Sequence, residues 1–239
     1  MGRRFSRWSR GSNVCAVELL AAGRDADVFA LDDHRVLRRY RDGRSAQREA
    51  GVIGHLTAAG FPTPGVLGGD GPDLVLERVA GPDLMTAMFM GAVTPDDAGV
   101  TLADLHRRLH AVPWDGGALV HLDLHPLNVL WTASGPVLLD WTNARPGEPG
   151  LDAAITAMIL AMALVAPDAF ADVGVDGRAI GAAVRRMLTT FAATAEPFTA
   201  HLDAAAEYRR SGRNTGDDER AALGEAVALV RSIAAGSDA

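Results

Sequence analysis

Short apolar segments separated by turns dominate residues 1–80, whereas apolar positions at helical spacing dominate the remainder. Segments of the first kind predict strands, and recurrence every three to four residues predicts helices that pack on a core. Strands are expected at 17–20, 27–31, 35–40 and 74–79, a turn at 68–71, and helices at 45–59, 83–90, 94–112, 176–192, 197–210 and 218–233. This order predicts a sheet-rich first part and a mostly helical second part.

A polar cluster lies in the middle of the chain, flanked by apolar runs. The runs are 118–120, 129–131 and 137–139, with a short turn at 134–136 between the last two. This pattern predicts a strand, a loop and a hairpin. The hairpin would bring Asp140, which follows its second strand, close to the loop that carries Asp123 and Asn128.

Two carboxylates and one amide would then converge on a small volume. Phosphoryl transfer requires such a set, because one carboxylate orients the attacking hydroxyl and accepts its proton. The other oxygen atoms are the hard ligands that hold Mg²⁺ against the phosphates of a nucleotide.

At these residues the sequence resembles the aminoglycoside phosphotransferase and choline kinase-like family, which is related to protein kinases. The family's loop reads H-x-D-x-H-x-x-N and its metal-binding segment reads D-W or D-F. The matching residues here are His121, Asp123, His125, Asn128 and Asp140-Trp141. The resemblance implies that Asp123 is the catalytic base, that Asn128 and Asp140 bind Mg²⁺, and that His121 and His125 support the loop.

Three other interpretations of the motif are open. His121, Asp123 and His125 on an extended segment could offer three ligands to zinc or to a pair of metal ions, as in a metal-dependent hydrolase. The loop could instead be a structural turn whose polar groups cap each other. A third possibility is a catalytically inactive kinase-like protein that binds a nucleotide or another ligand.

Composition narrows the choice of partners. The formal net charge of -7 argues against a nucleic-acid-binding protein, whose footprint is a basic patch. It is compatible with a cationic small-molecule acceptor. The chain contains 23 arginines and no lysine, and the absence of lysine rules out a Walker A phosphate loop.

Hydropathy and the N-terminal segment bear on location. No apolar run approaches the roughly 20 residues that a membrane helix needs, and the longest, 153–166, is expected to be a buried helix. The basic start of the chain lacks the apolar core of a signal peptide. We therefore expect a cytoplasmic protein without a membrane partner, and Cys15, the single cysteine, as a buried apolar residue.

The resemblance extends to the N-terminal part and implies a nucleotide site there. The hairpin turn with Gly23 would lie over the nucleotide phosphates, and Arg38 or its neighbour Arg39 would supply the phosphate-binding cation. Arg38 is preferred because it follows the pair Val36-Leu37, as in the family. Glu49 would pair with this cation, while the Glu77 carbonyl and the Val79 amide would contact adenine.

Residues of the C-terminal part are expected to support the loop, pack in helices or bind the acceptor. The segment 147–153 matches the family pattern G-x-P-x-x-D-x-A, which implies that Asp152 caps a helix and braces the loop. His106 and His110 are expected at the edge of a packed helix face, since half a metal site without a third ligand is a weak signal. Candidates for recognising a cationic acceptor are Asp203, Glu207 and 217–219, although a solvated helix face is also expected there.

Together these features predict an α+β, bilobal, protein-kinase-like fold. A small antiparallel-sheet lobe would cover residues 1–80, and a mostly helical lobe would cover residues 81–239. The expected reaction transfers the γ-phosphoryl group of ATP to a hydroxyl of an aminoglycoside-like, sugar or amino-alcohol acceptor, with Mg²⁺ as cofactor. Antibiotic resistance is a possible outcome, and the expected assembly is a monomer or a homodimer.

Overall fold

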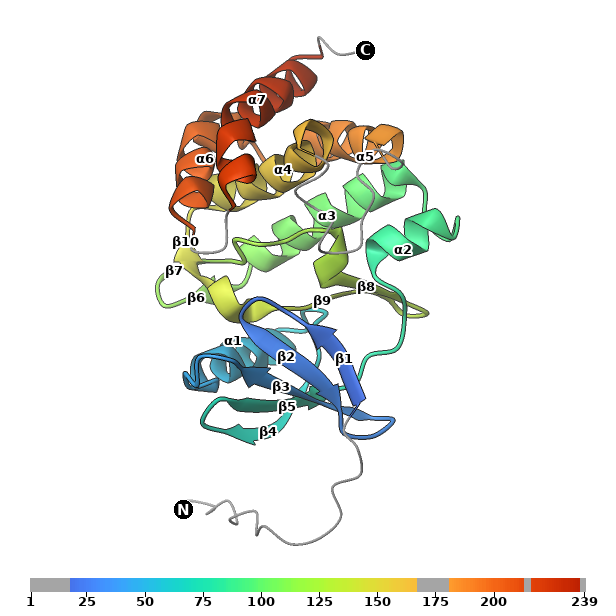
Figure 1. Ribbon diagram of the computed structural model, residues 1–239, viewed down its shortest axis with the longest axis vertical. Helices are drawn as coiled ribbons and strands as arrows, with labels where there is room; N and C mark the ends of the chain where they lie inside the picture. Colours follow the sequence, from blue (N-terminus) through green and yellow to red (C-terminus); the bar gives the residue numbers. More distant parts are fainter. Residues whose placement is uncertain (1–17, 167–180, 213–215, 237–239) are drawn as a thin grey trace, which may run out of the picture.

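The N-terminal part folds as a five-stranded antiparallel sheet. The computed structural model describes residues 18–166, 181–212 and 216–236. The strands are β1 (Glu18–Ala22), β2 (Ala26–Ala30), β3 (Arg35–Tyr40), β4 (Val66–Asp70) and β5 (Asp73–Glu77). They lie in the order β1-β2-β3-β5-β4, so β3 is the central strand. Figure 1 shows this sheet at the bottom of the molecule, below the helices.

A single helix, α1 (Gln47–Ala58), packs beside the sheet. Its buried apolar residues Val52, Ile53 and Leu56 recur at helical spacing and form its core-facing stripe. Glu49 lies on the same buried side, one turn earlier, although it carries a charge. A buried carboxylate requires a partner, and its partner comes from β3, as described below.

Strand β4 corrects the expected turn at 68–71. Gly68, Gly69 and Asp70 lie in the strand, and the turn falls at Gly71 and Pro72. A Cβ atom on Gly69 would collide with the backbone of Asp73, so the neighbouring strand requires glycine there. Two successive glycines have no side chains to show the alternation of a strand, which explains the wrong prediction.

Six helices form most of the rest of the described chain. They are α2 (Leu84–Phe89), α3 (Pro95–His110), α4 (Pro149–Val165), α5 (Gly181–Thr194), α6 (Leu202–Ser211) and α7 (Asp217–Ala234). Helix α4 is buried over most of its length and contacts α5, α6 and α7. In Figure 1 it crosses the centre of the helical part. No helix within the described ranges is both long and apolar enough to cross a bilayer.

Short strands carry the central loop. Three form a small sheet in the order β10-β7-β6: β6 (Pro113–Trp114), β7 (Gly117–Val120) and β10 (Arg145–Gly147). The expected hairpin consists of β8 (Val129–Thr132) and β9 (Gly135–Leu138), and its turn falls at residues 133–134. The polar loop therefore runs from the end of β7 to β8, through the short 3₁₀ helix Pro126–Asn128.

The linker from β5 to α2 is fastened to the β8–β9 hairpin. The Trp131 amide donates a hydrogen bond to the Pro82 carbonyl at 2.8 Å, and Asp83 forms a β-bridge with Leu130. Gly81 has a φ of 148°, and a Cβ atom there would collide with the Trp131 carbonyl. Glycine is thus required where the linker crosses the hairpin.

Helices α3 and α5 approach each other closely at Gly99. A Cβ atom on Gly99 would lie 2.6 Å from the Met187 carbonyl oxygen and 3.0 Å from the Phe191 amide nitrogen. Both atoms belong to the α5 backbone, which cannot move aside as a flexible side chain can. The two helices pack at this distance because the position has no side chain.

We expect Gly99→Ala to lower the free energy of unfolding by roughly 1–3 kcal/mol, the usual cost of overpacking. Gly54→Ala is the matched control, because Gly54 is also helical and its Cβ would meet nothing within 4 Å. The control should be neutral or stabilising by up to about 1 kcal/mol. Urea denaturation measures both variants, and equal effects would contradict the close approach.

Candidate functional site

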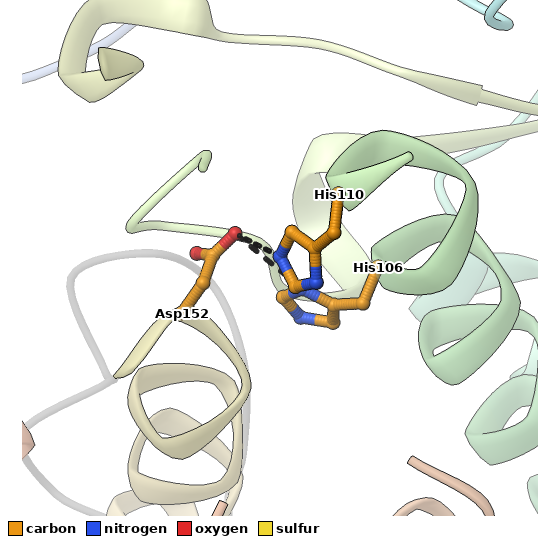
Figure 2. A group of neighbouring side chains, drawn as sticks. All are labelled: His106, His110 and Asp152. Atoms are coloured by element: carbon orange, nitrogen blue, oxygen red, sulfur yellow. Dashed lines mark hydrogen bonds and ion pairs between the residues drawn. The ribbon is translucent and has the colours of Figure 1, made fainter. Parts of the chain in front are cut away.

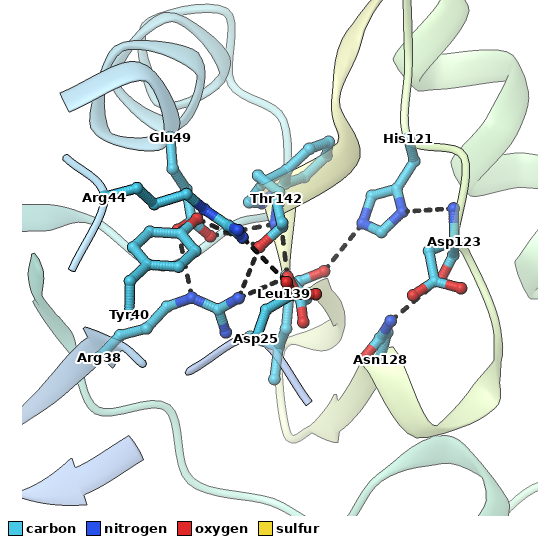
Figure 3. Close-up of polar contacts among 12 residues, drawn as sticks. Asp25, Arg38, Tyr40, Arg44, Glu49, His121, Asp123, Asn128, Leu139 and Thr142 are labelled. Atoms are coloured by element: carbon cyan, nitrogen blue, oxygen red, sulfur yellow. Dashed lines mark hydrogen bonds and ion pairs between the residues drawn. The ribbon is translucent and has the colours of Figure 1, made fainter. Parts of the chain in front are cut away.

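Arg38 connects three parts of the chain. Its Nε donates to Glu49 Oε2 at 3.2 Å, and its Nη2 donates to Asp140 Oδ1 at 2.6 Å and to Thr142 Oγ1 at 2.7 Å (Figure 3). The residue is 8% exposed. The guanidinium therefore joins β3 to α1 and to the segment that follows β9.

Arg39 points the other way. Its Nε and Nη2 atoms each donate to one oxygen of the Asp73 carboxylate at 2.6 Å, on the exposed surface of the sheet. Successive side chains of a strand face opposite sides, so only one of the two arginines can face the helical part. The structure places Arg38 there.

Tyr40 and Thr142 complete the network around Arg38, and the sequence analysis missed both. The Tyr40 hydroxyl donates to Glu49 Oε2 at 2.5 Å. Thr142 Oγ1 lies 3.2 Å from the Tyr40 hydroxyl and accepts from Arg38. Tyr40 follows Arg38 by two positions on a strand and so shares its face, which was the available signal. Thr142 had none, because its partners are distant in sequence.

Burial and charge act in opposite directions on the carboxyl groups here. Burial raises the pKa of Glu49, although Arg38 and Tyr40 favour its charged form. Burial also disfavours the charge on Asp140, but the Arg38 guanidinium, the hydrogen bonds from Thr142 and the nearby His121 together outweigh it and hold the pKa of Asp140 below its usual value. Burial raises the pKa of Tyr40 to about 12. Asp140 is thus ionised at neutral pH.

His121 holds the central loop against the end of β9. Its ring is fully buried and lies 4.8 Å from the Trp141 ring, edge to face. The Asp123 amide donates to Nδ1 at 3.2 Å, so Nε2 carries the proton and donates to the Leu139 carbonyl at 2.9 Å. Burial lowers the pKa of His121. One neutral imidazole therefore fixes Asp123 relative to Asp140, the residue after Leu139.

Asn128 and His125 stabilise the loop from the other side. Asn128 Nδ2 donates to the Asp123 carbonyl at 3.0 Å and lies 3.1 Å from His125 Nε2. Burial lowers the pKa of His125 to about 4 and raises that of Asp123 to about 6, while the charge of Arg209 favours the ionised form of Asp123. The loop thus presents a carboxyl group that titrates near neutrality beside a neutral histidine.

Asp152 holds the backbone at the start of the loop. Its carboxylate accepts from the His121 amide at 2.8 Å and from the Leu122 amide at 2.6 Å. Leu122 has a φ of 64°, a left-handed conformation that costs energy for a branched side chain. The sequence predicts that Asp152 caps the helix, and this is wrong, because α4 begins earlier and its N-cap is Glu148. The expected contact with the loop is present.

The environment of Asp152 also corrects the placement of two histidines. His106 is buried on α3, and His110 is half-buried with an enclosed side chain, so neither imidazole lies at the edge of a packed face. His110 Nε2 lies 3.1 Å and His106 Nδ1 3.5 Å from Asp152 Oδ2 (Figure 2). Burial opposes the charge of Asp152, but the two histidines outweigh it and hold its pKa well below the usual range. Asp152 and Glu196 raise the pKa of His110 against the effect of burial.

The group of His106, His110 and Asp152 and the group of His121, Asp123 and His125 differ in whether their side chains lie close enough to hold a metal ion. Across the described residues, His106, His110 and Asp152 are the one set of three such side chains close enough to hold an ion. The Asp152 carboxylate in that set already accepts two backbone amides, which indicates a hydrogen-bonded brace. His121, Asp123 and His125, the ligands of the hydrolase alternative, are not brought together in this way.

A cavity of about 650 Å³ lies between the sheet and the helical part. This volume suits a small ligand or nucleotide. Its walls include β1 to β3, β5, the linker and the end of β9, and among the expected site residues it touches Arg38, Glu49, Glu77, Val79 and Asp140. The lining includes Leu20 and Ala21 of β1 but stops before Gly23, which forms the turn to β2.

Four of the five acidic residues named as candidates for a cationic acceptor pair with arginines, and the fifth, Asp218, is exposed. Asp203 binds Arg231, Glu207 binds Arg210 and Asp217 binds Arg220, all on exposed surface. The buried Glu219 binds Arg209 of α6. Arg209 in turn lies 3.9 Å from Asp123, measured between Nη1 and Oδ1. No sequence pattern indicates this contact.

Comparison with known families agrees with this geometry. A sequence model described as the phosphotransferase enzyme family matches residues 16–119 and 115–188, more than half of the chain. The chain belongs to this phosphotransferase family. The resemblance inferred from the motif is thereby confirmed. No curated protein sequence matches the chain closely.

Solved structures of phosphotransferases share the fold at low sequence identity. A choline/ethanolamine kinase family protein from Mesorhizobium loti has a TM-score of 0.53 and 15% identity, covering 91% of this chain and 87% of its own. An ADP-bound aminoglycoside phosphotransferase has a TM-score of 0.55 and 13% identity, covering 91% of this chain and 94% of its own. An amicoumacin kinase has a TM-score of 0.54 and 12% identity, covering 92% of this chain and 88% of its own. The α+β, kinase-like fold expected from the sequence is confirmed.

We expect Asp152→Asn to lower the free energy of unfolding by about 1–3 kcal/mol, because an amide accepts fewer hydrogen bonds and strands a buried amide donor. The depressed pKa of Asp152 makes its contribution complete above the unfolded value near 4, and lost as pH falls below it. The difference from wild type should therefore shrink in acid.

Asp203→Asn is the control for this variant, because it removes an exposed carboxylate whose pair with Arg231 is worth little. Urea denaturation at neutral and acidic pH provides the measurement. A difference between Asp152→Asn and wild type that is constant with pH would contradict the assignment.

Proposed function

We propose that the protein transfers the γ-phosphoryl group of ATP to a hydroxyl group of a small molecule. The observation that carries the proposal is a pair of carboxyl groups, one on each side of His121, whose pKa values shift in opposite directions. Arg38 keeps Asp140 ionised, whereas burial raises the pKa of Asp123 to about 6. When the pKa values of two carboxyl groups in one site shift apart, the group with the lower pKa is suited to bind a cation and the group with the higher pKa is suited to accept a proton.

Asp140 and Asn128 fit the role of Mg²⁺ ligands. The side-chain nitrogen of Asn128 donates to the Asp123 carbonyl, so the side-chain oxygen of Asn128 is the atom that would bind the metal. Asp140 supplies a carboxylate that is charged at neutral pH. Oxygen donors of these two kinds suit Mg²⁺. When bound, Mg²⁺ would neutralise the charge of the nucleotide phosphates.

Arg38 would bind the phosphates of the nucleotide. Glu49 and Tyr40 fix its orientation from the buried side, so little freedom is lost when a phosphate binds. The Glu77 carbonyl and the Val79 amide, on the linker wall of the cavity, are the proposed adenine contacts. The amicoumacin kinase of similar fold was solved with AMP-PNP and Ca²⁺, which supports a nucleotide in this cavity.

Asp123 would act as the base. Its carboxylate accepts the proton of the attacking hydroxyl as the new oxygen–phosphorus bond forms, and ADP leaves with the electrons of the broken bond. His121 holds the Asp123 backbone in place and does not itself exchange a proton, because burial keeps it neutral. The proposal retains the cytoplasm, where ATP is supplied, as the location.

The raised pKa of Asp123 predicts a pH profile. Protonated Asp123 cannot accept a proton, so kcat/KM should fall tenfold per pH unit below about pH 6. Steady-state ADP formation measured across this range tests it. A profile without any change between pH 5 and 7 would argue against Asp123 as the base.

Two isosteric variants separate binding from chemistry. Asp123→Asn should keep the stabilisation by ATP and Mg²⁺ but lower kcat by roughly 10²–10⁴. Asp140→Asn should lose the part of the nucleotide stabilisation that depends on Mg²⁺. Thermal unfolding with and without each ligand, followed by ADP release with pooled hydroxyl compounds, provides both readouts.

Asp104→Asn is the control for these variants, since Asp104 pairs with Arg107 and Arg108 on the outer face of α3. It should behave as wild type in both assays. Mg²⁺-dependent nucleotide binding without any turnover in the wild type would instead favour the catalytically inactive alternative.

A further inference from the structure

His106 and His110 lie one turn apart on α3, and their rings meet Asp152 in the first turn of α4 (Figure 2). The atoms that face one another are His106 Nδ1, His110 Nε2 and Asp152 Oδ2. The carboxylate oxygen lies 3.5 Å from the first nitrogen and 3.1 Å from the second, and all three atoms lie within 4.8 Å of one another. The cluster is enclosed, since the three side chains are 1%, 3% and 0% exposed.

The outer nitrogen of the His106 ring carries a proton. His106 Nε2 lies 2.8 Å from Thr156 Oγ1, and that hydroxyl gives its single proton to the Leu124 carbonyl at 2.7 Å. Thr156 can therefore only accept from His106, which places a proton on Nε2. In the neutral ring the inner nitrogen, Nδ1, then has a lone pair, and across the described residues it has no hydrogen-bond partner.

His110 is oriented in a similar manner by Glu196, which follows α5. A carboxylate can only accept, so His110 Nδ1 carries a proton and donates to Glu196 Oε2 at 2.7 Å. The inner nitrogen, Nε2, faces Asp152. Both rings are thus held through their outer nitrogens by an oxygen acceptor, which is how proteins fix the orientation of histidines that bind a metal ion.

Protons alone do not satisfy the three inner atoms. Two neutral rings would turn lone pairs toward a carboxylate oxygen that also offers only lone pairs. A proton on His110 Nε2, which the raised pKa of His110 favours, leaves His106 Nδ1 as a buried nitrogen without a partner. A second proton, on His106, would place two charged rings with their centres 5.2 Å apart. One divalent cation would bind all three atoms at once.

The spacing and the donor atoms suit a transition metal ion. Zn²⁺ binds imidazole nitrogen and carboxylate oxygen at about 2.0–2.2 Å, so two ligand atoms of a tetrahedral site lie about 3.4 Å apart. The distances of 3.1 and 3.5 Å from Asp152 Oδ2 lie on either side of this value. Mg²⁺ prefers oxygen donors, so the two nitrogens distinguish this cluster from Asp140 and Asn128.

We propose that His106 Nδ1, His110 Nε2 and Asp152 Oδ2 bind one divalent transition metal ion, for which Zn²⁺ is the best match. The ion joins α3 to α4 where Asp152 holds the amides of His121 and Leu122. Asp152 can do both, because a carboxylate has about four lone-pair positions. The site lies apart from the proposed phosphotransfer chemistry and does not depend on it.

Metal binding by the full chain tests the proposal. Protein treated with a chelator is titrated with Zn²⁺ in excess Mg²⁺, and calorimetry with elemental analysis gives the stoichiometry. We expect one Zn²⁺ per chain, and a rise in Tm of roughly 5–10 °C when free Zn²⁺ is a hundred times Kd. X-ray absorption of the wild type at the zinc edge should show two imidazole ligands. Absence of stoichiometric binding, or ligands other than two imidazoles and oxygen, would overturn the proposal.

Three variants assign the ion to these residues. His106→Gln should abolish stoichiometric binding, because it removes the nitrogen that lacks a partner. Glu196→Gln should lower the Zn²⁺ affinity by roughly ten- to a hundredfold, the usual effect of a residue that orients a ligand. The Glu196 side chain is 39% exposed, so this variant should fold. His34→Gln is the control, because His34 is exposed in the turn between β2 and β3. Equal losses in all three would indicate surface binding and overturn the assignment.

Asp140→Asn separates this site from the proposed Mg²⁺ site. It should bind Zn²⁺ as the wild type does and lose Mg²⁺-dependent nucleotide binding, whereas Glu196→Gln should keep nucleotide binding. Zn²⁺ binding that is lost in Asp140→Asn and kept in His106→Gln would overturn the proposal. Normal Zn²⁺ binding without nucleotide binding in the wild type would instead remove phosphotransfer and leave this site in place.

Discussion

The buried carboxylate of Asp152 is the interaction on which the central loop depends. It is fully enclosed, yet it remains charged because two backbone amides and two histidines surround it. The amides belong to His121 and Leu122, and Leu122 adopts a left-handed conformation that the chain would not keep unaided. The histidines belong to α3, and Asp152 itself to α4. Packing of these two helices thus determines where Asp123 lies.

A second network links the sheet to the same place. Arg38 of β3 is held by Glu49 and bound to Asp140, so the sheet, α1 and the end of β9 share one guanidinium. His121 lies between the two networks, since it contacts the Asp123 amide and the Leu139 carbonyl. The opposite pKa shifts of Asp123 and Asp140 follow from this layout, because Arg38 contacts one carboxylate and burial dominates the other.

Local signals predicted most of this arrangement. The spacing from His121 to Asn128, the hairpin that follows, and the alternation along 35–40 are properties of adjacent residues, and they identified the loop, Asp140 and the two faces of β3. Strand β4 was missed because its glycines have no side chains. The contacts of Asp152 with His106 and His110, and of Arg209 with Asp123, join segments that are distant in sequence. Only tertiary packing brings such residues together, so their spacing could not reveal the contacts.

The fastening of the linker to the hairpin constrains how the two parts can move. The hydrogen bond from Trp131 to Pro82 and the tight crossing at Gly81 tie the linker to β8. Rotation of the sheet about this joint would change the width of the cavity least beside Glu77 and Val79, which lie on the linker, and most on the side away from the linker. The linker side of the cavity would thus keep a nearly constant width, while the opposite side would widen and narrow as the sheet rotates.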